Sequence, residues 1–470
     1  MKRKHISLAT IALGASLFAA NAQQNARTAY FFNDYAHIYR LNPALTSDRG
    51  HAAIGAGEIG ISAQSNLGLS TFIYPTGNKP TTFLNPKVDA NEFLGKLGKD
   101  NPMLLDLDLD ILSASFHTGK LFHNFDVTLR TDNGITVPYD AFRFMKAGSA
   151  DGRNTFAFSN LSLKHNSYLQ IAYGVSVELN EGLRVGGRLK ALGGIAGIDM
   201  NVANADILAS ADLWDISAQG QLRAALPKMV TVPLKPGTNE IDFGGIDADE
   251  SIRNNGLTGM GAALDLGVTW TTFDDLTVSA AVLDLGFMHW NNGLMAQSPA
   301  LAWKFDGFHD IDLSGKDESQ PSLGDQLNNI FDEIEGCMKF EKTGNSAYST
   351  MLAATVNAGA EYRMPFYDKL SAGVLLTANI DRHFGWKEGR VCLNWAPLDG
   401  LEFAGSAAYS DFGASLGAAV NARLLCFNLF ACVDSLLPMR EVNPQFIPIG
   451  KLNTNATVGL NIVFGKRKNN

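Results

Sequence analysis

The chain has 470 residues, and its 47 acidic and 38 basic side chains give it a formal net charge of −9. An excess of acidic groups argues against nucleic acid as a partner, because phosphate backbones are bound through clusters of Lys and Arg. Apolar residues make up 46% of the chain, with 46 Gly and 28 Phe, yet no run of 18 or more apolar residues follows residue 22, so no transmembrane helix is expected.

The first 22 residues have the pattern of a secretory signal peptide. Residues 1–5 are mostly basic, residues 6–20 are mostly apolar, and residues 20–22 form an Ala-Asn-Ala cleavage site. A retained N-terminal anchor is the alternative. Cleavage would leave a mature chain with 35 basic and 47 acidic residues, a net charge of about −12.

Residues 23–50 are irregular and rich in aromatic side chains, and they contain the motif Asn42-Pro43-Ala44. The Asn-Pro step breaks regular structure and favours a turn. If the strands that follow form a barrel, this segment has two places to lie, the lumen or the periplasmic rim. We predict that it plugs the lumen.

From His51 onward the chain is a succession of segments in which apolar and polar residues alternate. Side chains on a strand point alternately to opposite faces, so each segment has one apolar and one polar face. Strands are expected at residues 51–61, 65–74, 110–118, 122–131, 168–179, 183–191, 258–270, 276–287, 352–363, 369–380, 389–396, 400–410, 414–424, 426–433 and 451–464. Residues 138–146 suit a short helix better than a strand, and we allow about 14 to 16 strands in total.

The segment Leu452–Phe464 shows the pattern most clearly, with apolar residues at most even positions and polar residues at most odd ones. Soluble strands have about 5–6 residues, whereas a tilted strand of about 9–11 residues crosses a bilayer. An unpaired backbone group costs several kcal/mol in lipid, so spanning strands must close into a barrel. The predicted fold class is all-β, a transmembrane antiparallel β-barrel formed by residues 51–470.

Turn lengths predict how the barrel is oriented. Short connections such as residues 364–368 are expected on the periplasmic side, and the long loops at 198–257, 291–350 and 434–450 on the external side. The first of these loops has room for one hairpin. A helix is expected at residues 323–338 of the second long loop.

One strand changes its pattern halfway. In residues 276–287 the even positions are apolar up to Val282, and the odd positions take over from Leu283. A parity switch of this kind is what a β-bulge produces, so we predict a bulge at this point.

Five basic side chains on predicted strands are the candidates for ligand contacts in the lumen: Arg130, Arg184, Arg188, Lys190 and Arg423. A guanidinium grips a carboxylate through two hydrogen bonds, which strengthen in a dry lumen, so this set could hold an acidic head group. The alternative is a structural charge ladder in which the same side chains pair with inward carboxylates at Asp265, Glu361 or Glu402.

Three motifs that carry chemistry in other proteins do not fit here. Residues 55–60 match G-x-G-x-x-G and residues 413–417 match G-x-S-x-G, but both motifs need a helix to follow, and alternating segments follow instead. Residues 106–110 begin like a calcium loop but lack its Gly and Glu, so a solvated loop is expected there. We therefore expect no enzyme activity, no cofactor and no metal. The four cysteines are expected to be free thiols: Cys337, Cys392, Cys426 and Cys432.

Two sets of residues carry a resemblance to a known family: Asn42-Pro43-Ala44 near the N-terminus, and residues 259–270 with 283–286, which repeat Asp-Leu-Gly. With this architecture, the chain resembles the long-chain fatty-acid transporter (FadL-like) superfamily and a related, poorly characterised family of exported barrels. In the transporters the N-terminal segment plugs the lumen, and a lateral opening passes hydrophobic substrates to the membrane, so the resemblance implies the same layout here. The shuttle subunit of type IX secretion has a similar barrel, which implies an alternative role without transport.

Together these patterns predict a signal peptide (1–22), a plug (23–50) and a barrel (51–470) in the outer membrane of a Gram-negative bacterium. The predicted function is passive transport of small hydrophobic or amphipathic molecules, with the lipid bilayer and a hydrophobic ligand as partners. The alternative is an interaction barrel, either a secretion accessory or a structural protein, whose external loops bind a secretion or surface protein.

Overall fold

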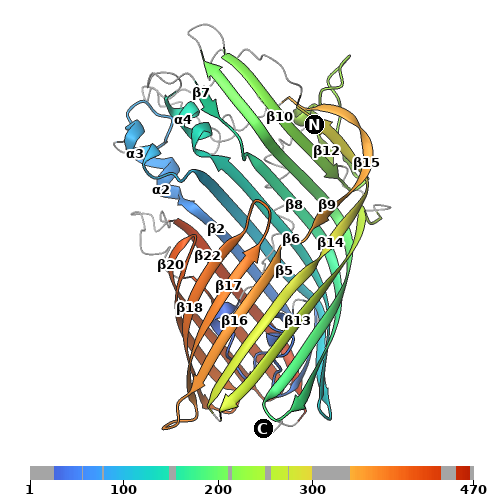
Figure 1. The fold of residues 1–470 in the computed structure, drawn as a ribbon, viewed down its shortest axis with the longest axis vertical. Coiled ribbons are helices and arrows are strands. Elements are labelled where there is room, and N and C mark those ends of the chain that lie inside the picture. The colour runs from blue at the N-terminus through green and yellow to red at the C-terminus, as the bar shows by residue number, and fades with distance from the viewer. Residues whose placement is uncertain are drawn as a thin grey trace.

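The computed structural model describes residues 26–55, 57–76, 79–147, 155–209, 214–248, 256–273, 275–298, 339–435 and 451–465. The predicted signal peptide and the predicted helix at 323–338 lie outside these residues, as does Cys337. The described residues form one tall barrel, and its wall is much higher on one side than on the other (Figure 1).

The barrel is a closed antiparallel sheet with fourteen strand positions. Eighteen strands fill these positions, because four of the positions each hold two strands, one after the other along the wall. These pairs are β1 and β2, β7 and β8, β10 and β13, and β15 and β16. The sheet closes where the last strand, β22, pairs with β1 and β2. The strands are β1 (Gly50–Ile54), β2 (Glu58–Gly68), β5 (Asp100–Thr118), β6 (Leu121–Pro138), β7 (Thr155–Ala157), β8 (Ser162–Asn180), β9 (Leu183–Ala209), β10 (Trp214–Ala225), β13 (Gly259–Phe273), β14 (Leu276–Gln297), β15 (Glu341–Met351), β16 (Ala354–Arg363), β17 (Leu370–Ile380), β18 (Trp386–Leu398), β19 (Leu401–Ser410), β20 (Gly413–Leu424), β21 (Phe427–Val433) and β22 (Lys451–Phe464).

The outer surface of the lower half is apolar, as alternation predicted. Its large exposed side chains include Ile59, Ile61, Ile171, Leu189, Met260, Leu266, Leu285, Phe287, Val374, Leu376, Val391, Leu393, Leu416, Leu429, Val458, Leu460 and Ile462. Trp270, Tyr362 and Trp395 are exposed close to the short turns, where membrane barrels carry an aromatic girdle. A closed barrel with such a belt is an outer-membrane protein, and its short turns mark the periplasmic side.

Several predictions of local structure differ from the structure. Residues 65–74 do not form a separate strand, because β2 continues to Gly68 and is followed by the helix α2 (Leu69–Phe72). The loop predicted at 291–350 is shorter than expected, because β14 continues to Gln297 and β15 begins at Glu341. Within the loop predicted at 198–257, the one hairpin that the sequence allowed is present, because β9 continues to Ala209 and pairs with β10. This hairpin rises beyond the apolar belt, so its outer face has no lipid to meet and its sequence lacks the apolar alternation of a spanning strand.

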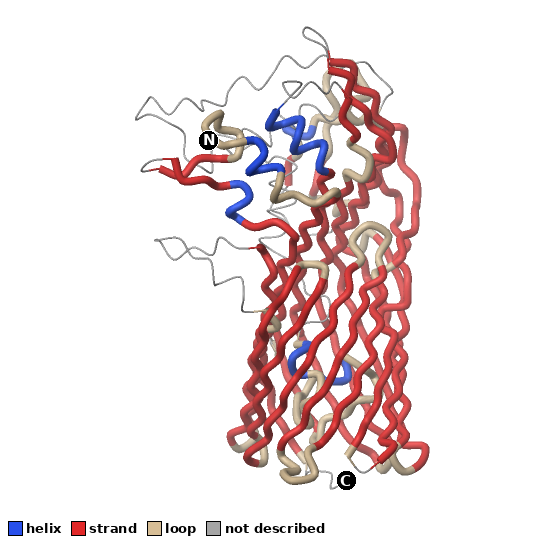
Figure 2. The backbone as a smooth tube through the Cα atoms, turned by 60° about the vertical axis from the view of Figure 1, so that its left-hand side comes forward, coloured by secondary structure: helices blue, strands red, loops and turns tan. Residues whose placement is uncertain are grey.

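The external end carries the helices, which lie above the strands in Figure 2. The helix predicted at 138–146 is present as α4 (Tyr139–Ala147), and it packs with α3 (Ala90–Leu94) around Phe83, Phe93 and Phe142. A hairpin of β3 (Ile73–Thr76) and β4 (Lys79–Thr82) lies beside them. An insertion between β10 and β13 contains β11 (Val230–Thr231), η3 (Phe243–Gly245) and β12 (Asp247–Ala248). Within the described part of the chain, no helix is both long enough and apolar enough to cross a membrane.

The bulge predicted in residues 276–287 is present. The pairing of β14 with β13 shifts register there, so Leu283 and Asp284 lie opposite the single residue Asp265. Asp284 has a φ of +56°, a region that Asp enters more readily than most residues. Its backbone N–H donates to Asp265 Oδ1 at 2.8 Å, and its side chain is buried in the lumen.

Candidate functional site

The plug, residues 26–49, lies inside the lower half of the barrel, where Figure 2 shows its two short helical turns. These turns are η1 (Arg27–Ala29) and η2 (Ile38–Arg40). Its apolar side chains cluster with residues of strands β17 to β21, which form the low wall. The cluster contains Tyr30, Phe31, Phe32, Tyr35, Ile38 and Leu41 of the plug and Leu375, Cys392, Ala404, Ala419, Phe430 and Cys432 of the low wall. Most of these wall residues are small, which leaves room for the aromatic rings of the plug. Among the described cysteines, Cys392, Cys426 and Cys432 are free, as expected.

Wall side chains satisfy the backbone of the plug. Irregular chain leaves its N–H and C=O groups unpaired, and such groups need partners when they are buried. Asp434 accepts the N–H of Thr28 at 2.7 Å. Glu402 accepts the N–H groups of Asn33 and Asp34 at 3.0 and 3.1 Å. The low wall therefore holds the plug by hydrogen bonds as well as by apolar packing.

The motif Asn42-Pro43-Ala44 fixes the other side of the plug to the tall wall, the higher side of the barrel that includes β13 and β14. Asn42 Nδ2 donates to the carbonyl oxygens of Val268 at 3.4 Å and Ala280 at 3.3 Å. Asn42 Oδ1 accepts the N–H of Ala44 at 2.9 Å, which holds the turn. The motif is thus the contact between the plug and strands β13 and β14.

The wall can approach the motif because it carries glycine there. A Cβ atom on Gly186 would overlap the carbonyl oxygen of Pro43, and one on Gly267 would overlap Asn42 Oδ1. Three more lumen-facing glycines stand against the plug in the same way: Gly359, Gly373 and Gly417. Part of the high glycine content is therefore explained by the fit of the plug to the wall.

One acidic group makes the seating of the plug depend on pH. Asp34 Oδ2 lies 3.6 Å from Arg423 Nε. Burial of Asp34, and then the charge of Asp48, raise its pKa from 3.8 to about 6, although Arg423 opposes the shift. A proton therefore binds more tightly to Asp34 in the seated plug than in a released one. By linkage, the seated state gains stability as the pH falls from about 6 to about 4, and this gain is absent above pH 6.

We expect the plug to be released more readily at pH 7 than at pH 5. Conductance of planar bilayers containing the protein measures this, because a released plug opens the lumen to ions. Asp34→Asn imitates the protonated state and should make the conductance at the two pH values nearly equal. A pH dependence that survives in Asp34→Asn would assign it to another group.

A layer of ion pairs crosses the lumen on the external side of the plug. The guanidinium of Arg188 lies between Asp126, with which it pairs, and Asp265, whose Oδ2 is 3.1 Å from Nη1. Its Nε donates to Asn124 Oδ1 at 2.9 Å, and it lies over the ring of Tyr39 at 5.0 Å. Arg188 is therefore held between two wall strands and the plug.

The layer continues through the bulge. Lys190 Nζ lies 2.7 Å from Asp265 Oδ1 and 2.6 Å from Asp284 Oδ1. Asp284 in turn lies 3.0 Å from Arg130 Nη1, and Arg130 Nε lies 3.1 Å from Asp108 Oδ1. The bulge thus places Asp284 where it links two of the predicted basic residues.

The plug completes the layer with its own cation. Arg40 Nη2 lies 2.5 Å from Asp110 Oδ1, and Nη1 lies 3.4 Å from Glu58 Oε1. His37 Nδ1 lies 3.1 Å from Glu58 Oε2. Four basic side chains and six carboxylates meet across the wall and the plug: Arg40, Arg130, Arg188, Lys190, Glu58, Asp108, Asp110, Asp126, Asp265 and Asp284. Carboxylates are therefore in excess.

A cavity of about 50 Å³ lies between the plug and this layer. Tyr35 and Arg40 of the plug border it on one side, and Asp108, Arg130 and Lys190 of the wall on the other. It has room for a few water molecules. The described residues thus leave a small polar space at this level.

The structure brings three of the five predicted basic residues together. Arg130, Arg188 and Lys190 share the layer, whereas Arg184 pairs with Glu178 near the periplasmic turns and Arg423 pairs with Asp34 and Asp399. Of the ladder partners considered, Asp265 pairs with Arg188 and Lys190 as anticipated, and the other two have different partners: Glu361 accepts from Ser371, and Glu402 from the plug. Whether the basic residues bind a ligand stays a prediction.

Six members of the layer were missed as site residues: Arg40, Glu58, Asp108, Asp110, Asp126 and Asp284. Asp126 lies on the same strand face as Arg130, so alternation could have indicated it. The parity switch at Leu283 was the signal for Asp284. The expectation of a solvated loop at residues 106–110 was wrong, because these residues lie in β5. In the described part of the chain, no three His, Cys, Asp or Glu side chains are grouped so as to hold a metal ion.

On the external side of the ion pairs, two apolar clusters lie among buried polar side chains such as Asp106, Asp132 and His165. One buried cluster consists of Tyr168, Leu192, Ala225, Ala263, Met288, Trp290, Tyr348 and Leu352. A second consists of Leu104, Phe384, Trp386 and Phe412. The turn between β17 and β18 reaches across to the tall wall: the Phe384 ring lies 2.7 Å from where a Cβ on Gly134 would be, and Asp381 Oδ2 lies 2.5 Å from Lys164 Nζ. A molecule entering from outside therefore meets apolar clusters with polar groups between them before it reaches the ion-pair layer.

Comparison with known proteins adds a family. Residues 43–434 match the model described as "Family of unknown function (DUF5723)". Among solved structures, the Ralstonia pickettii toluene transporter TbuX is 10% identical with a TM-score of 0.44, over 95% of this chain and 97% of that one. A Pseudomonas aeruginosa FadL homologue is 12% identical with a TM-score of 0.42, over 95% and 98%. The P. putida toluene transporter TodX is 7% identical with a TM-score of 0.40, over 92% and 99%. No curated protein sequence matches the chain.

Proposed function

Because the chain belongs to the DUF5723 family of unknown function, its own geometry has to suggest a role, and we propose that it is a passive channel for small hydrophobic or amphipathic molecules. The observation that carries this proposal is the order of layers in the lumen. From outside inward, a molecule meets two apolar clusters with polar groups between them, then the ion pairs, then the plug. Apolar clusters at the entrance favour molecules that leave water readily.

The charge balance of the ion-pair layer favours neutral substrates. Each of its four basic side chains lies within 4 Å of a carboxylate, and the carboxylates outnumber the basic groups. An acidic head group would have to displace one of these carboxylates and leave it buried without a partner, which costs several kcal/mol. The substrate class that fits is a small molecule with an apolar body and an uncharged polar group.

Uptake of a hydrophobic dye tests the proposal. Cells with a lipopolysaccharide outer membrane that express the protein should take up N-phenyl-1-naphthylamine several-fold faster than cells without it, as followed by fluorescence. Met288→Gln makes one apolar cluster polar at a side chain that is 0% exposed, and should slow this uptake. Met351→Gln, at a lipid-facing residue of β15 that is 69% exposed, is the matched control and should not.

The amount of assembled barrel has to be the same in each strain, which a heat-modifiable band on SDS gels verifies. If expression does not accelerate dye uptake, or if the two Met variants behave alike, the barrel does not conduct through this lumen. The interaction alternative stays a prediction, since most of the second long loop lies outside the described residues.

A further inference from the structure

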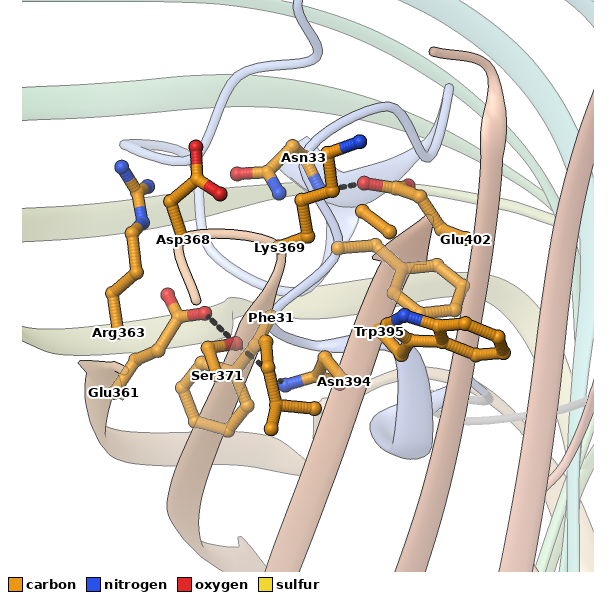
Figure 3. A pocket seen from close by; sticks show the side chains of 13 residues that line it. Phe31, Asn33, Glu361, Arg363, Asp368, Lys369, Ser371, Asn394, Trp395 and Glu402 are labelled. Carbon is orange, nitrogen blue, oxygen red and sulfur yellow. Dashed lines mark hydrogen bonds between the residues drawn. The ribbon is translucent and has the colours of Figure 1, made fainter. Parts of the chain in front are cut away.

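A second, smaller cavity lies at the periplasmic rim, apart from the ion-pair layer. It has a volume of about 30 Å³ and lies between residues 31–33 of the plug and the lower ends of strands β16 to β18. Figure 3 shows Glu361, Ser371 and Asn394 side by side, with Phe31 next to them. Each of the three polar residues comes from a different one of these adjacent strands.

Hydrogen bonds in this pocket all run in one direction. Asn394 Nδ2 donates to Ser371 Oγ at 3.3 Å, and Ser371 Oγ donates its proton to Glu361 Oε1 at 2.6 Å. Ser371 uses its one donor on Glu361, and Asn394 uses one of its two amide N–H groups on Ser371, so acceptor atoms are left for an incoming group. A ligand of this pocket has to supply the donors.

The side-chain oxygen of Asn394 is an acceptor that lacks a donor. Asn394 is 6% exposed, and within the described residues its Oδ1 is a buried atom with no hydrogen-bond partner. A buried polar atom left in this state costs about 1–3 kcal/mol. A donor group placed in the cavity would satisfy this atom. The cavity and the unpaired oxygen therefore both indicate a ligand.

Charge and size narrow the chemistry of that donor. The carboxylate of Glu361 favours a cation, and the ring of Phe31 also attracts positive charge at its face. Three carboxylates line the pocket, Glu361, Asp368 and Glu402, against two cations, Arg363 and Lys369. The Lys369 ammonium donates a hydrogen bond to the carbonyl oxygen of Pro397 at 2.9 Å. The cavity has room for about two water-sized groups, enough for a small head group but not for a ring.

We propose that the rim pocket binds a primary ammonium group carried on a short apolar chain. The ammonium lies between Glu361 and Asn394 Oδ1, with the chain against Phe31. The inference does not rest on the proposed transport function, because a barrel that conducts nothing would still present this pocket to the periplasm.

Three probes of equal chain length test it: hexylammonium, hexanol and hexanoate, each titrated against the full-length protein in nonionic detergent and amine-free buffer, by calorimetry at pH 7. We expect saturable binding of hexylammonium, and binding at least tenfold weaker for hexanol and hexanoate. Comparison with protein-free micelles removes the partition of each probe into detergent.

Variants assign the binding to the pocket. Glu361→Gln keeps an oxygen for Ser371 but removes the charge, and should weaken hexylammonium binding at least tenfold; Asn394→Leu should weaken it several-fold. Glu181→Gln, on an exposed periplasmic turn away from the pocket, is the control and should change it less than twofold. The proposal is overturned if hexylammonium does not bind, if hexanol binds as well, or if Glu361→Gln binds like the unaltered chain. A heat-modifiable band on SDS gels shows that each variant has formed its barrel.

Discussion

Gly267→Val is expected to displace the plug while leaving the barrel intact. A Cβ atom at this position overlaps Asn42 Oδ1 and lies 2.9 Å from Pro43 Cδ, whereas valine itself suits a strand. Overpacking costs about 1–3 kcal/mol, which shifts the ratio of seated to released plug by about 5- to 150-fold. Trypsin cleavage after Arg40, whose ion pairs hold it inside the lumen, followed by mass spectrometry, measures this release.

Gly405→Val is the matched control for this experiment. Gly405 lies on the outward face of β19, and a Cβ atom there would meet nothing within 4 Å. The same substitution should therefore leave Arg40 protected. Equal cleavage in the two variants would show that valine loosens the barrel in general, and that the fit between the motif and the wall does not hold the plug.

Arg188→Ala is expected to destabilise the protein by about 3–5 kcal/mol, because it leaves two buried carboxylates without their shared cation. The side chain of Arg188 is 1% exposed, and both Asp126 and Asp265 are fully buried. The urea concentration at the midpoint of unfolding, read from the heat-modifiable band, measures the loss. Adding Asp126→Asn to this variant should recover part of it, because Asp126 loses its closest cation, whereas Asp265 keeps Lys190 at 2.7 Å.

Arg184→Ala provides the comparison on the same strand. Arg184 pairs at 3.3 Å with Glu178, whose side chain is 34% exposed, and partly exposed pairs contribute about 0–1 kcal/mol. We therefore expect only a small shift of the urea midpoint. If Arg188→Ala is as stable as Arg184→Ala but weakens ligand binding, the ion-pair layer serves the ligand more than the fold.

The sequence predicted the membrane-spanning part of the fold well, because lipid imposes a strict pattern on it. Strands such as β17, β20 and β22 were placed to within a residue or two, since each outward position had to be apolar. Beyond the belt this constraint ends. The hairpin of β9 and β10 rises beyond the belt and its sequence lacks the apolar alternation, so this segment was predicted as a loop with room for one hairpin.

The site was predicted in part, for a similar reason. Alternation shows that Arg188 and Lys190 point inward, but it cannot show which inward side chains from distant strands meet. Arg40 lies on irregular chain, where no periodicity indicates a direction, and its partners Asp110 and Glu58 follow 70 and 18 residues later. Such a network depends on barrel closure and on the position of the plug, neither of which is encoded locally.

The way the plug is held has a consequence for biogenesis. Its partners lie on strands from both ends of the barrel: Glu58 on β2, Gly186 on β9, and Phe430 and Asp434 at β21 and just after it. This surface does not exist until the last strand has joined the first. The plug leads the barrel in the chain, yet it has to remain unfolded until insertion is complete, so we infer that it is the last part of the described chain to become ordered.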